Sequence, residues 1–133
     1  MSLNLTAQDQ QTVRTAAYGA VSLLASTGGK PSKAATEGSL ALMSATGPIG
    51  HVLAAKSKDI KLKGKSVAEL ADQVLPALTA AVALLEQKDP AEAGNFRTTV
   101  LIAVDSAARI SQGNPAPATA EMARKITAAL DAA

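Results

Sequence analysis

The side chains that could do chemistry in this sequence are few, and their types exclude several kinds of site. The chain has no cysteine and a single histidine, His51. Without cysteine there can be no disulfide, thiol nucleophile, iron–sulfur cluster or cysteine-containing zinc site, and sites that need two imidazoles are excluded as well. We therefore expect a protein without a cofactor.

His51 follows Gly50 at the predicted start of a short helix, and it could act as a general base because an imidazole titrates near neutral pH. Catalysis would also require partner residues, and the sequence has no Ser/His/Asp order and no Gly-x-Ser-x-Gly motif. A structural or surface histidine is the alternative, and the sequence favours it. We expect no catalytic residue and a protein that is not an enzyme.

Lysines are concentrated in one part of the chain. Residues 30–65 hold seven lysines against two acids, a net charge of +5, whereas the rest of the chain carries −3. Between residues 56 and 65, Ile60 and Leu62 alternate with lysines, which predicts an extended piece or an ordered loop. The candidate anion-binding residues are Lys56, Lys58, Lys61, Lys63 and Lys65.

These lysines could attract phosphates in a salt-dependent way or bind an anionic partner, and a solvated loop is the simpler interpretation. Nucleic acid is a less favoured partner for two reasons. No aromatic residue is interleaved with the lysines, and the short helix before them offers only His51 and Lys56 to base edges.

The elements that must position these groups are predicted helices separated by glycine and proline. Apolar residues make up 47% of the 133 residues and aromatic residues 2%, and 30 residues are alanine, so the core must consist mostly of small side chains. Apolar residues recur at helical spacing, and no strand pattern is evident outside residues 56–65. The sequence predicts an all-α fold, a compact bundle of five or six helices in one domain spanning residues 1–133.

Capping residues predict where the helices begin. We expect starts at Thr6 with Asp9 three residues on, at Ser32, at Ser66 with Glu69, and at Asp89 followed by Pro90, with a short helix over 49–56 and a last helix after Pro117. The helix predicted after Ser32 carries few polar residues and is expected at the centre of the bundle. Pro76 predicts a kink or a junction between two helices. The predicted inward residues include Val13, Ala17, Leu24, Leu70, Val74, Leu78, Phe96, Val100, Met122 and Ile126.

The two ends of the chain resemble each other. Residues 13–21 (VRTAAYGAV) match residues 96–104 (FRTTVLIAV), and after one inserted residue a glycine–proline turn follows in both halves. Each second helix then carries a glutamate about one turn inside its start, Glu37 in the first half and Glu121 in the second. This pattern predicts duplication of a helical hairpin.

An alanine-rich helix, a glycine turn and a second helix with an early glutamate, present twice, resemble the TerB-like family of tellurite-resistance proteins. The resemblance covers residues 13–45 and 96–130. It implies an all-helical bacterial stress-response domain in the cytoplasm that holds a metal ion through acidic residues. The family's aspartate before the turn glycine is absent here, because Thr27 and Gln112 stand at those places. We therefore expect the fold to carry over, and no metal site.

The sequence also gives expectations about the binding partner of the protein and its location in the cell. Glu37, Glu121 and His51 are the candidate ligand-binding or partner-binding residues, and a protein partner or a homodimer is the expected complex. Residues 1–12 show neither the basic start nor the apolar run of a signal peptide. The most apolar stretch, Val74 to Leu85, is shorter than the roughly 20 residues that span a bilayer. We expect a cytoplasmic protein without membrane contact.

Overall fold

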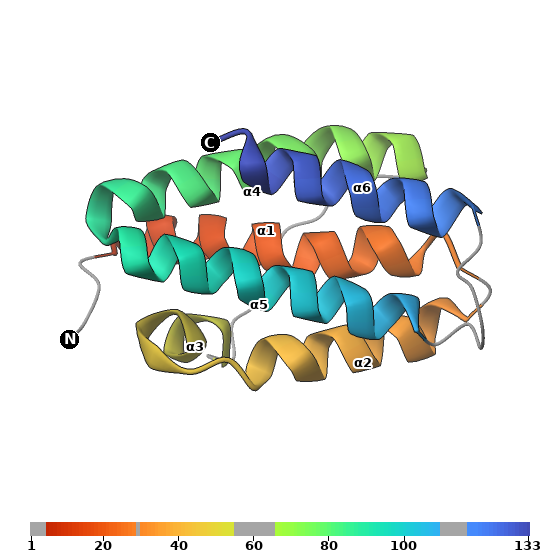
Figure 1. Cartoon of the computed structure of the whole chain (residues 1–133), viewed down its shortest axis with the longest axis horizontal. Coiled ribbons are helices and arrows are strands. Elements are labelled where there is room, and N and C mark those ends of the chain that lie inside the picture. The colour runs from red at the N-terminus through yellow and green to blue at the C-terminus, as the bar shows by residue number, and fades with distance from the viewer. Residues whose placement is uncertain (1–4, 29, 55–65, 110–116) are drawn as a thin grey trace.

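The computed structural model describes residues 5–28, 30–54, 66–109 and 117–133. Over these ranges the chain forms six α-helices and no β-strand, which confirms the predicted all-α bundle (Figure 1). The helices are α1 (Ala7–Ala25), α2 (Pro31–Met43), α3 (Gly47–Ala54), α4 (Val67–Lys88), α5 (Pro90–Ala108) and α6 (Pro117–Asp131).

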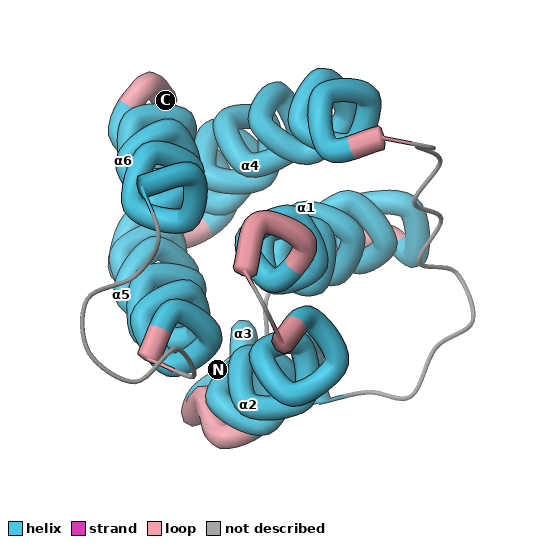
Figure 2. The backbone as a smooth tube through the Cα atoms, turned by 90° about the vertical axis from the view of Figure 1, so that its right-hand side faces the viewer, coloured by secondary structure: helices cyan, strands magenta, loops and turns pink. Residues whose placement is uncertain are grey.

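The central helix is α1. Seen end-on, α4 lies above it, α5 and α6 lie to its left and α2 lies below it (Figure 2), and it contacts each of the other five helices. The prediction that the second helix lies at the centre is wrong, because α2 leaves Leu40 and Met43 exposed. The predicted inward residues Val13, Ala17 and Leu24 of α1 are buried. The buried residues of α1 also include Ala16, Gly19 and Ala20, and small residues let neighbouring helices approach closely.

The local capping signals locate most of the helix starts. Thr6 and Asp9 form the capping box of α1, the Ser66 hydroxyl accepts a hydrogen bond from the Glu69 amide, and the Asp89 carboxylate accepts one from the Ala91 amide. The prediction of a cap at Ser32 is wrong. The cap is Lys30, and α2 begins two residues earlier than predicted, at Pro31, whose fixed φ and missing N–H suit the first helical position.

Two glycines matter around α2 and α3, Gly38 for close packing and Gly47 for its backbone conformation. An alanine Cβ at Gly38 of α2 would lie 2.6 Å from the Val21 Cγ1 atom of α1 and 3.3 Å from the Ala103 carbonyl oxygen of α5. Gly47 has φ +77° and begins α3, two residues before the predicted start. Because Gly38 has no side chain, α2 packs tightly between α1 and α5.

The longest helix, α4, runs unbroken through Pro76, so neither a junction nor two shorter helices is present there. Its inner side buries Val74 and Leu78 as predicted, whereas Leu70 is only partly buried. In α5 the Phe96 ring is completely buried, again as predicted. The predicted loop at 56–65 and the predicted end of the fifth helix near Gln112 lie outside the described residues.

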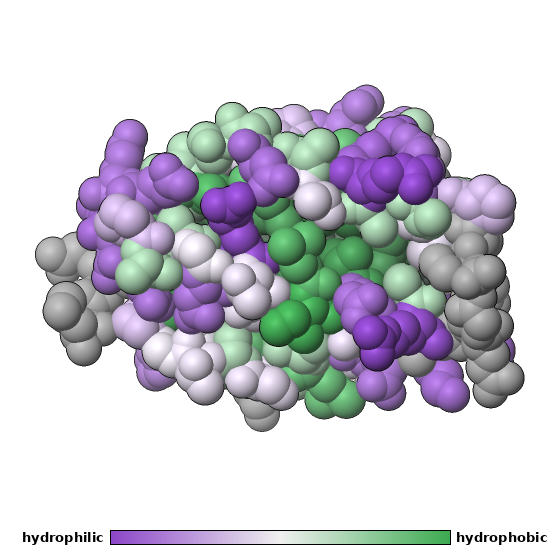
Figure 3. Space-filling model, in the orientation of Figure 1, coloured by the Kyte–Doolittle hydropathy of each residue, from purple (hydrophilic) through white to green (hydrophobic). Residues whose placement is uncertain are grey.

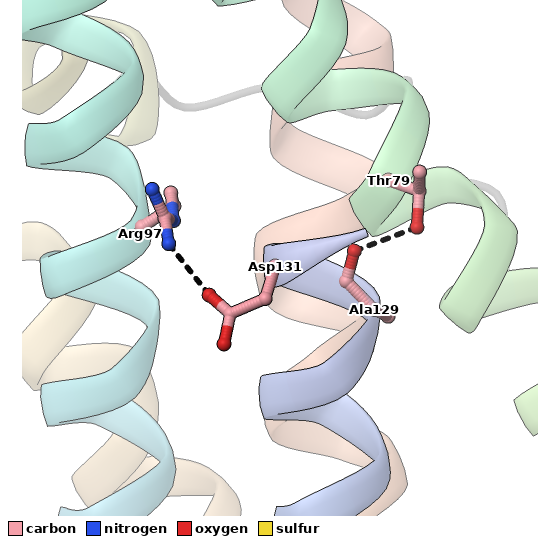
Figure 4. A network of polar contacts seen from close by, with 4 residues as sticks. All are labelled: Thr79, Arg97, Ala129 and Asp131. Carbon is pink, nitrogen blue, oxygen red and sulfur yellow. Dashed lines mark hydrogen bonds and ion pairs between the residues drawn. The ribbon is translucent and has the colours of Figure 1, made fainter. Parts of the chain in front are cut away.

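Helix α6 closes the bundle through polar contacts to three other elements. Its Asp131 pairs with Arg97 of α5, and its Ala129 carbonyl accepts a hydrogen bond from the Thr79 hydroxyl of α4 at 2.7 Å (Figure 4). At the other end, the hydroxyl of Thr119 donates to the Thr27 carbonyl in the turn after α1. Thus α1–α2 and α5–α6 form two contacting helical pairs in the order that the sequence repeat predicts.

Candidate functional site

The structure does not bring the predicted ligand residues together. Glu37 is exposed on α2 and Glu121 is exposed on α6, and the described parts of these two helices do not contact each other. His51 is exposed in the last turn of α3. Lysines 56, 58, 61, 63 and 65 lie outside the described residues. Glu37, Glu121 and His51 therefore occupy separate positions on the surface.

Glu121 forms an ion pair within its own helix. Its carboxylate accepts a hydrogen bond from Arg124 at 2.7 Å, and the hydrogen bond and charge of that guanidinium lower the pKa of Glu121. This ion pair joins residues three positions apart on α6. Within the described ranges, no three His, Asp or Glu side chains gather where they could hold a metal ion.

Two polar side chains of α1, Arg14 and Tyr18, are buried or partly buried. Arg14 is only 5% exposed, and the hydroxyl of Tyr18 donates to the Leu53 carbonyl of α3 at 2.7 Å. Burial raises the pKa of Tyr18, and the charge of Arg14 partly offsets that rise. Sequence patterns contain no sign of the contact between Tyr18 and Leu53, because the two residues are 35 positions apart in the chain. The Tyr18 hydrogen bond links α3 to α1.

Glu92 caps α3 from another helix. Its Oε1 atom accepts a hydrogen bond from the Ile49 amide at 3.1 Å, and the Asn95 amide donates to the Thr46 carbonyl at 3.0 Å. A carboxylate at a helix N-terminus satisfies free amides and interacts favourably with the helix dipole. Local sequence indicates Glu92 only as an acid at the start of its own helix. Its role here is structural, since it fixes α3 against α5.

The most distinctive feature of the surface is a group of exposed apolar side chains. Five large hydrophobic side chains are exposed among the described residues, and four of them belong to α2 and α5. In Figure 3, hydrophobic surface crosses the middle of the molecule over α5 and extends toward α2, with hydrophilic groups at both sides. We call this the α2–α5 face. Its large apolar residues are Leu40, Met43, Leu101 and Ile102.

Two shallow hollows shape the α2–α5 face. One, of about 180 Å³, lies where α2 meets α5 and is lined by Ala41, Ser44, Ala45, Thr99 and Ile102. The other, of about 300 Å³, lies on the outer side of α2 and includes Leu40 and Met43. Ile102 is the most exposed of the large apolar residues, at 56%. The small side chains of α2 therefore leave room beside Ile102 for an additional apolar group.

The rim of this face is charged and balanced in sign. Asp105 pairs with Arg109 in the last turns of α5, and Arg97 pairs with Asp131 on the other side of Leu101 and Ile102. Each ion pair joins exposed groups, so each contributes little to stability. An apolar centre inside a polar rim is the composition of many protein-binding surfaces.

No family model, curated protein or solved structure matches this chain. The resemblance to TerB-like proteins accordingly stays a prediction.

Among the described helices, α4 alone is long and apolar enough to cross a membrane by length and composition. Its most apolar window has a mean hydropathy of 1.4, and 22% of that window is buried inside the bundle. The helix is longer than the apolar stretch from Val74 to Leu85 considered in the sequence. Core helices of soluble proteins pass the same test, so this is weak evidence for a membrane, and the cytoplasmic location is still a prediction.

Proposed function

We propose that this protein is a non-enzymatic helical module that binds a partner protein on the α2–α5 face. The observation that carries the proposal is the placement of exposed large apolar side chains, four of five on two neighbouring helices. Apolar surface that is contiguous and rimmed by polar groups marks interaction sites in soluble proteins. The scattered positions of His51, Glu37 and Glu121 offer no comparable cluster.

The composition of α5 supports the same proposal. Its middle, residues 100–104 (VLIAV), is apolar on all sides, and a helical segment of this kind is normally buried on all sides. On its inner side α5 buries Phe96, Val100 and Val104, and on its outer side it exposes Leu101 and Ile102. A bound partner would cover this outer side and fill the hollow beside Ile102.

Photo-cross-linking in cells tests the proposal and requires no candidate partner. Leu101 is replaced by p-benzoyl-phenylalanine, and the control carries the same group at Ala83, which is exposed on α4. We expect a discrete cross-linked product from position 101 and none from position 83. Equal patterns from the two positions would contradict a specific binding face, and mass spectrometry of the product identifies the partner.

The TerB-like resemblance is kept as a more specific proposal, in which the module acts in bacterial stress or tellurite resistance. The two contacting helical pairs, α1–α2 and α5–α6, support it, but Glu37 and Glu121 do not share a site. Titration with Ca²⁺, Mg²⁺ or Zn²⁺ while the melting temperature is followed tests a metal-holding role, since a ligand that binds only the folded state raises that temperature. We expect no rise.

Nucleic-acid or anionic-partner binding through the lysines of segment 56–65 is the alternative proposal. The net charge of +5 over residues 30–65 favours it. Because phosphate contacts release counterions, such binding would weaken steeply as the salt concentration rises. This dependence separates it from apolar binding on the α2–α5 face, which salt weakens little.

A further inference from the structure

We propose that the α2–α5 face binds a second copy of this chain, with the two α5 helices packed antiparallel about a two-fold axis near Leu101 and Ile102. This inference rests on the proposed function and names its partner. Three features of α5 support it: the outward stripe, the order of its polar residues and the length of the helix.

The outward stripe of α5 has its apolar residues in the middle. Ala91, Gly94, Thr98, Asp105 and Arg109 are exposed at helical spacing, with Leu101 and Ile102 at the centre of the series. A two-fold axis between residues 101 and 102 places Leu101 and Ile102 of one copy against the same residues of the second copy. The Ile102 side chain of each copy then reaches the hollow of about 180 Å³ beside Ile102 of the other.

The polar residues fix the antiparallel direction. Parallel helices would set Asp105 of one copy beside Asp105 of the other, and like charges directly opposite each other are unfavourable. In the antiparallel arrangement Thr98 and Asp105 lie equal distances from the axis, so the Thr98 hydroxyl of each copy faces the Asp105 carboxylate of the other. Arg109 in turn faces Gly94, which has no side chain and no atom within 4 Å of its Cβ position.

A stable dimer would extend the contact beyond α5 to the neighbouring helices. At 1.5 Å per residue the 19 residues of α5 extend about 28 Å. A standard interface buries about 800 Å² on each partner, which is about a ninth of the 7113 Å² of this chain. A footprint as long as α5 and about as wide, including the adjoining surfaces of α2 and α6, meets that need.

Light scattering and sedimentation on the purified full chain test the proposal. The wild type should have about twice its chain mass of 13.4 kDa at micromolar to millimolar concentrations. Ile102→Glu should be monomeric because it places a charge in the apolar centre, and Ala83→Glu, which makes the same change on α4, should remain dimeric. Both positions are exposed, so circular dichroism should show an unchanged fold.

The contact between Thr98 and Asp105 gives a sharper test. Thr98→Lys should tighten the dimer about fivefold at low salt through two new ion pairs, and Thr98→Asp should weaken it by a similar factor. The gain from Thr98→Lys should disappear when Asp105 is also replaced by alanine. Within its own chain residue 98 has no acid three or four positions away, so an intramolecular pair on α5 does not explain the gain.

A monomeric wild type overturns the proposal, and so does a dimer that Ile102→Glu and the Thr98 variants leave unchanged. The proposed function is separable from this inference by the cross-linking experiment. A product from position 101 that contains a different protein would contradict self-association and leave the binding face standing. No product from that position would contradict both.

Discussion

Alanine at Gly38 should destabilise the protein, although alanine favours helices. A Cβ atom at this position of α2 would lie 2.6 and 3.0 Å from the two methyl groups of Val21 and 3.3 Å from the Ala103 carbonyl oxygen. Val21 is buried in α1, and a β-branched side chain in a helix has one strongly preferred χ1 rotamer. Neither the methyl groups nor the backbone of α5 can move aside easily.

The change in the free energy of unfolding caused by Gly38→Ala is the sum of two opposing effects. Replacing glycine by alanine inside a helix gains about 1 kcal/mol from helix propensity, and overpacking a tight contact costs about 1–3 kcal/mol. Gly94 in α5 supplies the matched control, because it is exposed and has no atom within 4 Å of its Cβ position. Gly94→Ala should therefore stabilise, and the difference between the two variants should be about 1–3 kcal/mol.

Urea unfolding followed by far-ultraviolet circular dichroism measures both free energies. The double variant Gly38→Ala with Val21→Ala removes the obstructing methyl groups, so the two substitutions should show a favourable coupling of about 1 kcal/mol. If Gly38→Ala stabilises as much as Gly94→Ala, or if Gly38→Ala and Val21→Ala act independently, α2 does not approach α1 as described.

Three further predictions concern the core, the alkaline limit of stability and the lysines. Phe96→Ala should reduce the free energy of unfolding by about 3–5 kcal/mol, since the ring is completely buried, and a loss below about 1 kcal/mol in urea unfolding would contradict its core position. Tyr18→Phe should cost about 1 kcal/mol at neutral pH by removing the hydrogen bond to Leu53. Because burial raises the pKa of Tyr18 in the folded protein, the stabilisation by its hydroxyl is complete below about pH 10 and is lost as the pH rises through the folded pKa. The free energies of unfolding of wild type and Tyr18→Phe should therefore converge at high pH. A constant difference between the two across this pH range would refute the prediction. For the nucleic-acid alternative, binding of random duplex DNA at low salt should fall sharply when lysines 56, 58, 61, 63 and 65 become glutamine, and unchanged binding, measured by fluorescence anisotropy, would rule that alternative out.

Local features of the fold were predictable because they depend on residues close together in sequence. The caps at Thr6, Ser66 and Asp89 each involve a side chain and an amide within three residues. The burial of Phe96 followed from helical spacing on a chain with few large side chains. At Ser32 two local rules competed, and the preference of proline for the first helical turn located the start.

Contacts between distant residues were not predictable from such patterns. Glu92 caps α3 across 43 residues, and Gly38 touches both α1 and α5 only because of how α2 packs. Periodicity identified the inner side of α5, but it could not show that Leu101 and Ile102 stay uncovered. The candidate site is the α2–α5 face, which was recognised from the apolar side chains that the bundle leaves exposed. The sequence had instead indicated His51 and the two glutamates.

The central claim is that the α2–α5 face is covered by a partner in the cell. The chain has no cysteine, so a single introduced thiol reports on one place only. Alkylation rates of Ile102→Cys and of the α4 control Ala83→Cys are measured in living cells and in dilute purified protein. We expect position 102 to react several-fold more slowly in cells than in dilute solution, with position 83 unchanged, and equal ratios at the two positions would contradict the claim.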